Sequence, residues 1–235
     1  MNTINILSGG AAQGLVGSLA AKFKTLTGFD IGGEFGAVGA MADKLRKGTA
    51  TDIVILTSAI LARLADENLV VRASISDVGL VETALAVRAG DPQVKVTDAA
   101  TLRAAFLAAD AIFVPDTKVS TAGIHIAKVL EQLGIADKAA ARLKVYPNGA
   151  TAMRHMAGSD AKKPIGCTQS TEIISTEGVV LSGSLPKGCD LATMYTAGVT
   201  MQAVHARQAQ ALIDLLIGAD QRALRTAAGF LSGSK

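Results

Sequence analysis

The stretch TINILSGGAAQGLVGSLAAKF, residues 3–23, joins a short apolar run, a turn of small residues and a helical pattern. Thr3–Leu7 is expected to form a strand, and the turn that follows contains Ser8, Gly9, Gly10, Ala11 and Ala12. After this turn, Leu15, Leu19 and Phe23 recur at helical spacing. The chain therefore opens with a strand-loop-helix unit.

The same unit recurs twice in the next 45 residues. Asp30–Phe35 reads as a strand, Gly36–Gly39 as a turn and Ala40–Arg46 as a helix. Asp52–Leu56 is a third strand, which leads through Thr57 and Ser58 into another helical pattern. Strands that alternate with helices predict an α/β fold with a largely parallel sheet covered on both faces. Ligands of such sheets bind at the carboxyl ends of the strands.

A second α/β series follows the strand expected at Leu80–Val87. Its helices are expected at residues 99–108, 123–133 and 150–156, and its strands at 111–114, 144–146 and 164–167. A final strand, Tyr195–Val199, precedes the helices at 206–217 and 221–228. We expect two lobes, residues 1–80 with 195–235 and residues 81–194, whose two crossover strands form a hinge.

Composition excludes several classes of function. The 235 residues are 49% hydrophobic and only 3% aromatic, and the formal net charge is +3 without a basic block. A globular protein with a substantial core is expected, and nucleic acid is not an expected partner. No apolar run is long enough to span a membrane, so no membrane insertion is expected.

Cysteine and histidine usage indicates neither a metal site nor a cofactor. Cys167 and Cys189 have no metal-ligand spacing and read as ordinary buried thiols, with a single bridge between them as the alternative. The three histidines are separated and lack paired ligands. No nucleophile motif of a hydrolase is present.

The chain begins without the pattern of a signal peptide. The sequence as written therefore predicts a cytoplasmic protein, and a periplasmic one if a leader has been removed.

Two groups of loops are candidates for anion binding, because helix N-termini present backbone N–H groups. In the first lobe, Ser8, Gly9 and Gly10 form such a turn, although a tight packing turn explains these small residues equally well. In the second lobe, Lys118, Ser120 and Thr121 precede one helix. Asn148, Ala150 and Thr151 stand at the next helix. Plain helix capping is the alternative there.

The order of these loops resembles the molybdate-binding type of periplasmic solute-binding protein, which has the type II fold of ABC transporter receptors. The resemblance covers nearly the whole chain. It is clearest in residues 4–12, 35–48, 51–55 and 114–123 and in the tail LIDLLIGADQRALRTAAGF, residues 212–230.

This resemblance implies that both lobes hold one small anion in the cleft between them. Positions where that family places oxyanion-binding serines carry Ala11, Ala37 and Val38 here, and Gln169 stands near the place of a family tyrosine. Fewer hydroxyl donors favour a larger organic carboxylate over molybdate or tungstate. The expected ligand-binding set is Ser8, Gly9, Gly10, Ala11, Gly36, Ala37, Val38, Thr57, Ser58, Lys118, Ser120, Thr121, Asn148, Ala150, Thr151 and Gln169.

Three functions are compatible with this pattern. The first is a substrate-binding protein whose ligand-bound form is recognised by a transporter or signalling partner. The second is an isomerase of an unsaturated di- or tricarboxylate, because the chain also resembles the aconitate isomerase branch of this fold. Its base would be Lys118, Glu34 or His155, although His155 also reads as a surface histidine. The third is a cytoplasmic ligand sensor.

Overall fold

The computed structural model describes residues 2–231, and the chain divides into two compact units. Unit 1 contains Met1–Val81 and Thr193–Lys235, and unit 2 contains Glu82–Ala192. The chain leaves unit 1 within the strand β4 (Ser76–Arg88) and returns within the strand β9 (Ala192–Val199). Both passages therefore run through β-strands.

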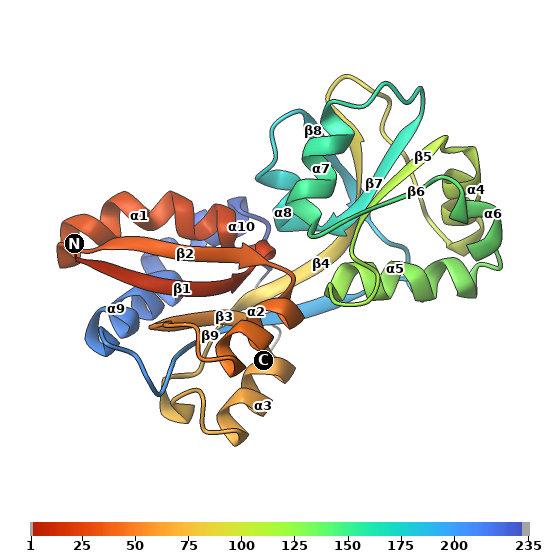
Figure 1. The fold of residues 1–235 in the computed structure, drawn as a ribbon. Helices are drawn as coiled ribbons and strands as arrows, with labels where there is room; N and C mark the ends of the chain where they lie inside the picture. Colours follow the sequence, from red (N-terminus) through yellow and green to blue (C-terminus); the bar gives the residue numbers. More distant parts are fainter. Residues whose placement is uncertain (1, 232–235) are drawn as a thin grey trace. The chain divides into compact units, whose positions relative to one another are not determined.

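Unit 1 contains a sheet with the strand order β2-β1-β3-β9 (Figure 1). The strands β1 (Thr3–Gly9), β2 (Asp30–Gly36) and β3 (Ile53–Thr57) are parallel, and β9 pairs with β3 in the antiparallel direction. Every residue of β3 is buried, as expected for a central strand that is covered on both faces.

The helices of unit 1 pack in two pairs. The helix α1 (Gln13–Thr27) packs against α9 (Ala206–Ile217), and α2 (Val38–Arg46) packs against α3 (Ser58–Asp66). The short helix α10 (Arg222–Ala227) follows, and the 3₁₀ turns are η1 (Gly10–Ala12), η2 (Arg72–Ser74) and η3 (Ala219–Gln221). The predicted strand-loop-helix units are confirmed.

Unit 2 is built on β4, β5 (Ala111–Pro115), β6 (Leu143–Tyr146), β7 (Pro164–Gln169) and β8 (Val179–Ser184). The strands β6, β5 and β7 are parallel, whereas β4 is antiparallel to both β7 and β8. The carboxyl ends of β5, β6 and β7 therefore meet at one edge of the sheet.

Two cores lie on the two faces of this sheet. On one face, residues of α4 (Ala99–Ala108), α5 (Thr121–Gln132) and α6 (Ala136–Ala140) join Leu85 and Cys167 in one cluster. On the other, α7 (Gly149–Ala157) and α8 (Ser170–Ile174) contribute to a cluster with Ala84 and Ala86. Cys167 and Cys189 are free and buried.

Several boundaries differ from expectation. The strand β4 begins at Ser76 and not near Leu80, and α2 begins at Val38, inside the segment predicted to be a turn. The elements β8, α6 and α8 were not predicted. The pattern of β8, VVLSGS, contains a glycine and two serines and is only partly buried, so its apolar signal is weak.

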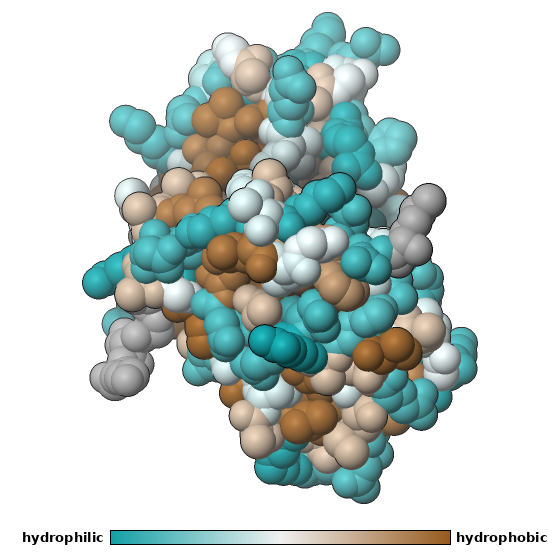
Figure 2. Space-filling view, turned by 90° about the vertical axis from the view of Figure 1, so that its left-hand side faces the viewer, coloured by the Kyte–Doolittle hydropathy of each residue, from teal (hydrophilic) through white to brown (hydrophobic). Residues whose placement is uncertain are grey.

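Exposed apolar side chains are dispersed over the described surface. Large ones with at least a third of their surface exposed include Leu26, Val145, Val180 and Val204. Figure 2 shows apolar areas on one face of the molecule that are separated by hydrophilic ones. Scattered apolar residues of this kind are usual on protein surfaces. Within residues 2–231, no helix has the length and apolar character needed to cross a lipid bilayer.

Candidate functional site

The structure brings the predicted residues of unit 1 to the carboxyl ends of three adjacent strands. Ser8 and Gly9 end β1, Gly36 ends β2, and Thr57 ends β3. The strands are parallel, and Gly9 is the register partner of Gly36. Gly10, Ala11, Ala37, Val38 and Ser58 follow these strand ends directly. All nine predicted residues of unit 1 thus lie at one sheet edge.

This edge of unit 1 offers few hydroxyl groups. Ala11, Ala37 and Val38 are buried apolar residues, and the hydroxyl of buried Ser8 donates to the carbonyl oxygen of Gly9 at 2.9 Å. Thr57 is buried and makes no side-chain capping bond to α3. The hydroxyl proton of Ser8 is therefore already engaged.

Gly9 is required at this edge by close packing. A Cβ atom on Gly9 would lie 2.8 Å from Val38 Cγ1 and 2.9 Å from Tyr195 Cε1. Both distances are shorter than normal van der Waals contact. Tyr195 was predicted as a strand residue but not as a residue of the site; it is buried in β9 and packs directly over the end of β1.

In unit 2 the predicted residues again follow the ends of parallel strands. Lys118, Ser120 and Thr121 come after β5, Asn148 and Ala150 come after β6, and Gln169 ends β7. Thr151 stands in the first turn of α7, where its N–H donates to Asn148 Oδ1 at 2.8 Å. For Asn148 the structure therefore shows the helix-capping role.

The N-terminus of α7 already holds a carboxyl group of the protein. Glu172 is buried and accepts hydrogen bonds from the backbone N–H groups of Gly149, Ala150 and Gln169. Its Oε2 also accepts from Thr168 Oγ1 at 2.6 Å. Sequence reasoning missed Glu172, and no local pattern marks it. The amide of Ala150 thus serves an internal carboxyl group.

The N-terminus of α5 differs from that of α7. Ser120 precedes the helix and is buried, yet its side chain makes no capping hydrogen bond. Asp116 turns the preceding loop by accepting from the N–H groups of Lys118 at 2.7 Å and Val119 at 3.1 Å. Lys118 is exposed. This end of α5 therefore combines a helix start that has no side-chain cap with a lysine two residues earlier in the chain, and the free N–H groups of a helix start can bind an anion.

Gln169 lies at the same sheet edge, and its side-chain amide is buried without hydrogen-bond partners in the part of the chain that the structure describes. It is 3% exposed, and neither its Nε2 nor its Oε1 has a hydrogen-bond partner within the described residues. A buried polar group without a partner costs about 1–3 kcal/mol. Such groups are rare in native proteins, and each calls for an explanation such as a functional role, a bound ion or an ordered water.

Two of the three candidates for a catalytic base, Glu34 and His155, make contacts with other side chains. Glu34, in β2, is exposed and forms an ion pair with Lys44 of α2. His155 is exposed on α7 and stacks on Tyr146, with ring centroids 4.4 Å apart. Among residues 2–231, no group of three His, Cys, Asp or Glu side chains could hold a metal ion.

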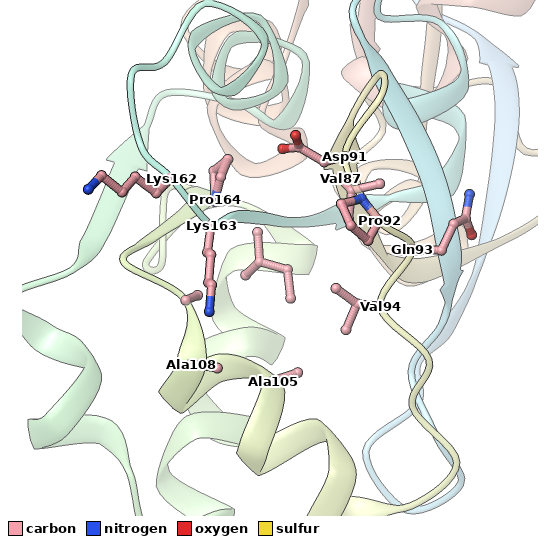
Figure 3. Close-up of a pocket in the computed structure, with 12 residues that line it drawn as sticks. Val87, Asp91, Pro92, Gln93, Val94, Ala105, Ala108, Lys162, Lys163 and Pro164 are labelled. Carbon is pink, nitrogen blue, oxygen red and sulfur yellow. The ribbon is translucent and has the colours of Figure 1, made fainter.

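A pocket of about 360 Å³ lies elsewhere in unit 2, between α4 and the amino end of β7 (Figure 3). Its walls include Val87, Val94, Ala105 and Ala108. The side chain of Lys163 extends towards Ala108, and that of Lys162 points away. None of the predicted site residues lines this pocket.

Comparison with known proteins places the chain in a family. Residues 4–231 match the family described as bacterial extracellular solute-binding protein, and the chain belongs to this family. An aconitate isomerase of Pseudomonas sp. is 24% identical over 231 residues, which cover 94% of this chain and 84% of that protein.

Solved structures agree on the fold. The periplasmic molybdate-binding protein of Azotobacter vinelandii has a TM-score of 0.80 at 17% identity, covering 98% of this chain and 100% of that one. The sulfate-binding protein SubI of Mycobacterium tuberculosis has a TM-score of 0.73 at 17% identity, covering 98% and 86%. The mixed α/β fold of type II periplasmic binding proteins is thus confirmed, as is the resemblance to the molybdate-binding type.

The environment of Glu172 leads to a prediction about pH. Burial raises the pKa of this carboxyl above its usual value and outweighs the opposing effect of its four hydrogen bonds. The unfolded chain therefore releases this proton at a lower pH than the folded chain. We expect the stabilising contribution of the protonated group to be lost as pH rises from about 4 towards the raised pKa.

The measurement is urea unfolding of the wild type and Glu172→Gln at pH 4, 6 and 8. The variant does not titrate, so its free energy of unfolding should rise relative to that of the wild type as pH increases. Glu177→Gln, which alters an exposed carboxylate nearby, is the control. A wild-type-to-variant difference that stays constant across this range would contradict the prediction.

Proposed function

We propose that this chain binds a small organic anion, with the N-terminus of α5 as the anion-binding element of unit 2. The observation that carries the proposal is the contrast between two helix starts at one sheet edge. The start of α7 is occupied by Glu172, whereas α5 begins at Ser120, which makes no capping bond, two residues after the exposed Lys118. Membership of a family of solute-binding proteins supports this role, because binding a ligand requires no catalytic group.

An organic carboxylate suits the site better than a tetrahedral inorganic oxyanion. A buried, fully ionised oxyanion needs many hydrogen-bond donors. In unit 1, Ala11, Ala37 and Val38 supply no hydroxyl group, and the Ser8 proton is engaged. The proteins of similar fold include ones named for molybdate and sulfate, so both ions belong in the test.

The test is isothermal titration calorimetry with molybdate, sulfate, succinate and citrate. We expect succinate or citrate to bind. Ser120→Ala should lower the affinity for that carboxylate about tenfold or more, because a hydrogen bond to a charged group contributes about 1.5–3 kcal/mol. Ser18→Ala removes an exposed hydroxyl of α1 and should leave affinity unchanged. Tight binding of molybdate or sulfate alone would contradict the choice of ligand class.

Lys118 provides a second variant for the same titration. Lys118→Gln should weaken binding several-fold, and the loss should shrink at high salt because exposed charges are screened. Lys138→Gln, another exposed lysine of unit 2, is the matched control. The partner expected for such a binding protein is a transporter or a signalling protein that recognises its ligand-bound form.

The similarity to an aconitate isomerase favours one alternative, an isomerase of an unsaturated carboxylate. Of the three base candidates, Lys118 is the one on the loop before α5, and Glu34 and His155 have other contacts. Proton NMR of aconitate with the protein in D₂O separates the two functions. Conversion or deuterium incorporation that Lys118→Gln abolishes would establish the enzyme, and binding without conversion would establish the binder.

A further inference from the structure

Two neighbouring strands of unit 2 carry a pair of buried polar side chains that lack partners. Thr83 of β4 and Gln169 of β7 are register partners. They are 1% and 3% exposed, and Thr83 Oγ1, Gln169 Nε2 and Gln169 Oε1 have no hydrogen-bond partner within residues 2–231. Side chains in such a register stand next to each other on one face. These two nevertheless do not bond to each other.

The pair lies on the face of the sheet that α5 covers. Thr83 and Gln169 alternate with residues of the opposite face and so share the face of Leu85 and Cys167. Those two residues belong to the core that includes Ile126 and Val129 of α5. Because Gln169 ends β7 and α5 follows the end of the parallel strand β5, the pair lies at the sheet edge where α5 begins.

The chemistry of this pair selects a particular ligand. A glutamine amide has two N–H donors and a carbonyl acceptor, and a threonine hydroxyl both donates and accepts. A fully ionised oxyanion or carboxylate only accepts, so an anion that accepts from both Gln169 Nε2 and the Thr83 hydroxyl would leave Gln169 Oε1 without a donor. A ligand hydroxyl can accept from one of these groups and donate to the other.

We propose that Thr83 and Gln169 form a subsite that binds a hydroxyl group of the ligand, so that the anion is a hydroxycarboxylate. This inference rests on the proposed function and narrows its ligand class. A site built around a substrate hydroxyl discriminates strongly against the analogue that lacks it, because its own polar groups then stay unpaired.

The test uses two pairs of probes that differ by one hydroxyl group: malate against succinate, and citrate against tricarballylate. Titration calorimetry of the wild type should show at least about tenfold tighter binding of the hydroxylated member of a pair. Thr83→Val and Gln169→Met should reduce this preference to about twofold or less, with succinate or tricarballylate affinity retained. Thr25→Val and Gln202→Met, both at exposed positions, are the matched controls.

The outcomes separate the inference from the proposed function. Equal affinity of the wild type for both members of each pair would overturn the hydroxyl subsite and leave an anion-binding protein. A preference that survives in both variants would overturn the assignment to Thr83 and Gln169. Failure of all four probes to bind would overturn both proposals. The wild-type comparison holds even where a variant fails to fold.

Discussion

Gly149→Ala should lower the free energy of unfolding by about 3 kcal/mol. A Cβ atom at Gly149 would overlap Glu172 Oε2 and Thr168 Oγ1 and lie 2.6 Å from Glu172 Cδ. These atoms are buried and bonded to each other at 2.6 Å, so neither side chain can move without breaking the contact. The methyl group therefore forces the Glu172 carboxyl away from the amides that it accepts from.

Urea unfolding followed by circular dichroism measures this effect. Gly158→Ala is the matched control at the other end of α7, because its Cβ would meet only Arg154 O, at 4.0 Å. We expect that control to change stability by no more than about 0.5 kcal/mol. Equal stability of the two variants would show that the packing around Glu172 is not as tight as described.

Gly123→Ala should destabilise the chain by about 2–3 kcal/mol and weaken anion binding at least about tenfold. A Cβ atom here would overlap the carbonyl oxygen of Asp116 and lie 2.6 Å from that of Pro115. Both are backbone atoms at the end of β5, so no side chain can rotate away. The first turn of α5 would have to move from its place.

Calorimetric titration and urea unfolding together check this prediction. Gly17→Ala, at an exposed position of α1 with no atom within 4 Å of the added Cβ, is the control. It should leave binding unchanged and raise stability by about 0.5–1 kcal/mol, because alanine favours a helix over glycine. Wild-type affinity in Gly123→Ala would contradict a role for the α5 start in binding.

Local patterns predicted most helices and strands because each depends on its own residues. The helices predicted at 99–108 and 206–217 agree with α4 and α9. The structure adds that Asp98 caps the start of α4. The strand ends were less accurate. Gly9 and Gln169 belong to β1 and β7, since pairing with neighbouring strands extends a strand beyond its apolar run.

The polar contacts of unit 2 were beyond sequence reasoning because they join distant parts of the chain. Gln169 was nominated from a resemblance, but its position opposite Thr83 depends on the antiparallel register of β4 and β7. Glu172 stands in α8 and accepts from Gly149 and Ala150 of another helix. Nothing in the spacing of these residues indicates such contacts. The sequence did allow the loops of the candidate site to be placed at one sheet edge, because the carboxyl ends of parallel strands lie at the same edge.

The two passages of the chain through β4 and β9 also set the order in which the units become complete on the ribosome. Unit 2 is one uninterrupted segment, Glu82–Ala192, whereas unit 1 waits for β9, which pairs with β3, and for α9, which packs on α1. Until residues 195–199 emerge, one edge of β3 has unpaired N–H and C=O groups, which favour aggregation. The strands β1, β2 and β3, which are synthesised before unit 2, therefore belong to the unit that is completed after it.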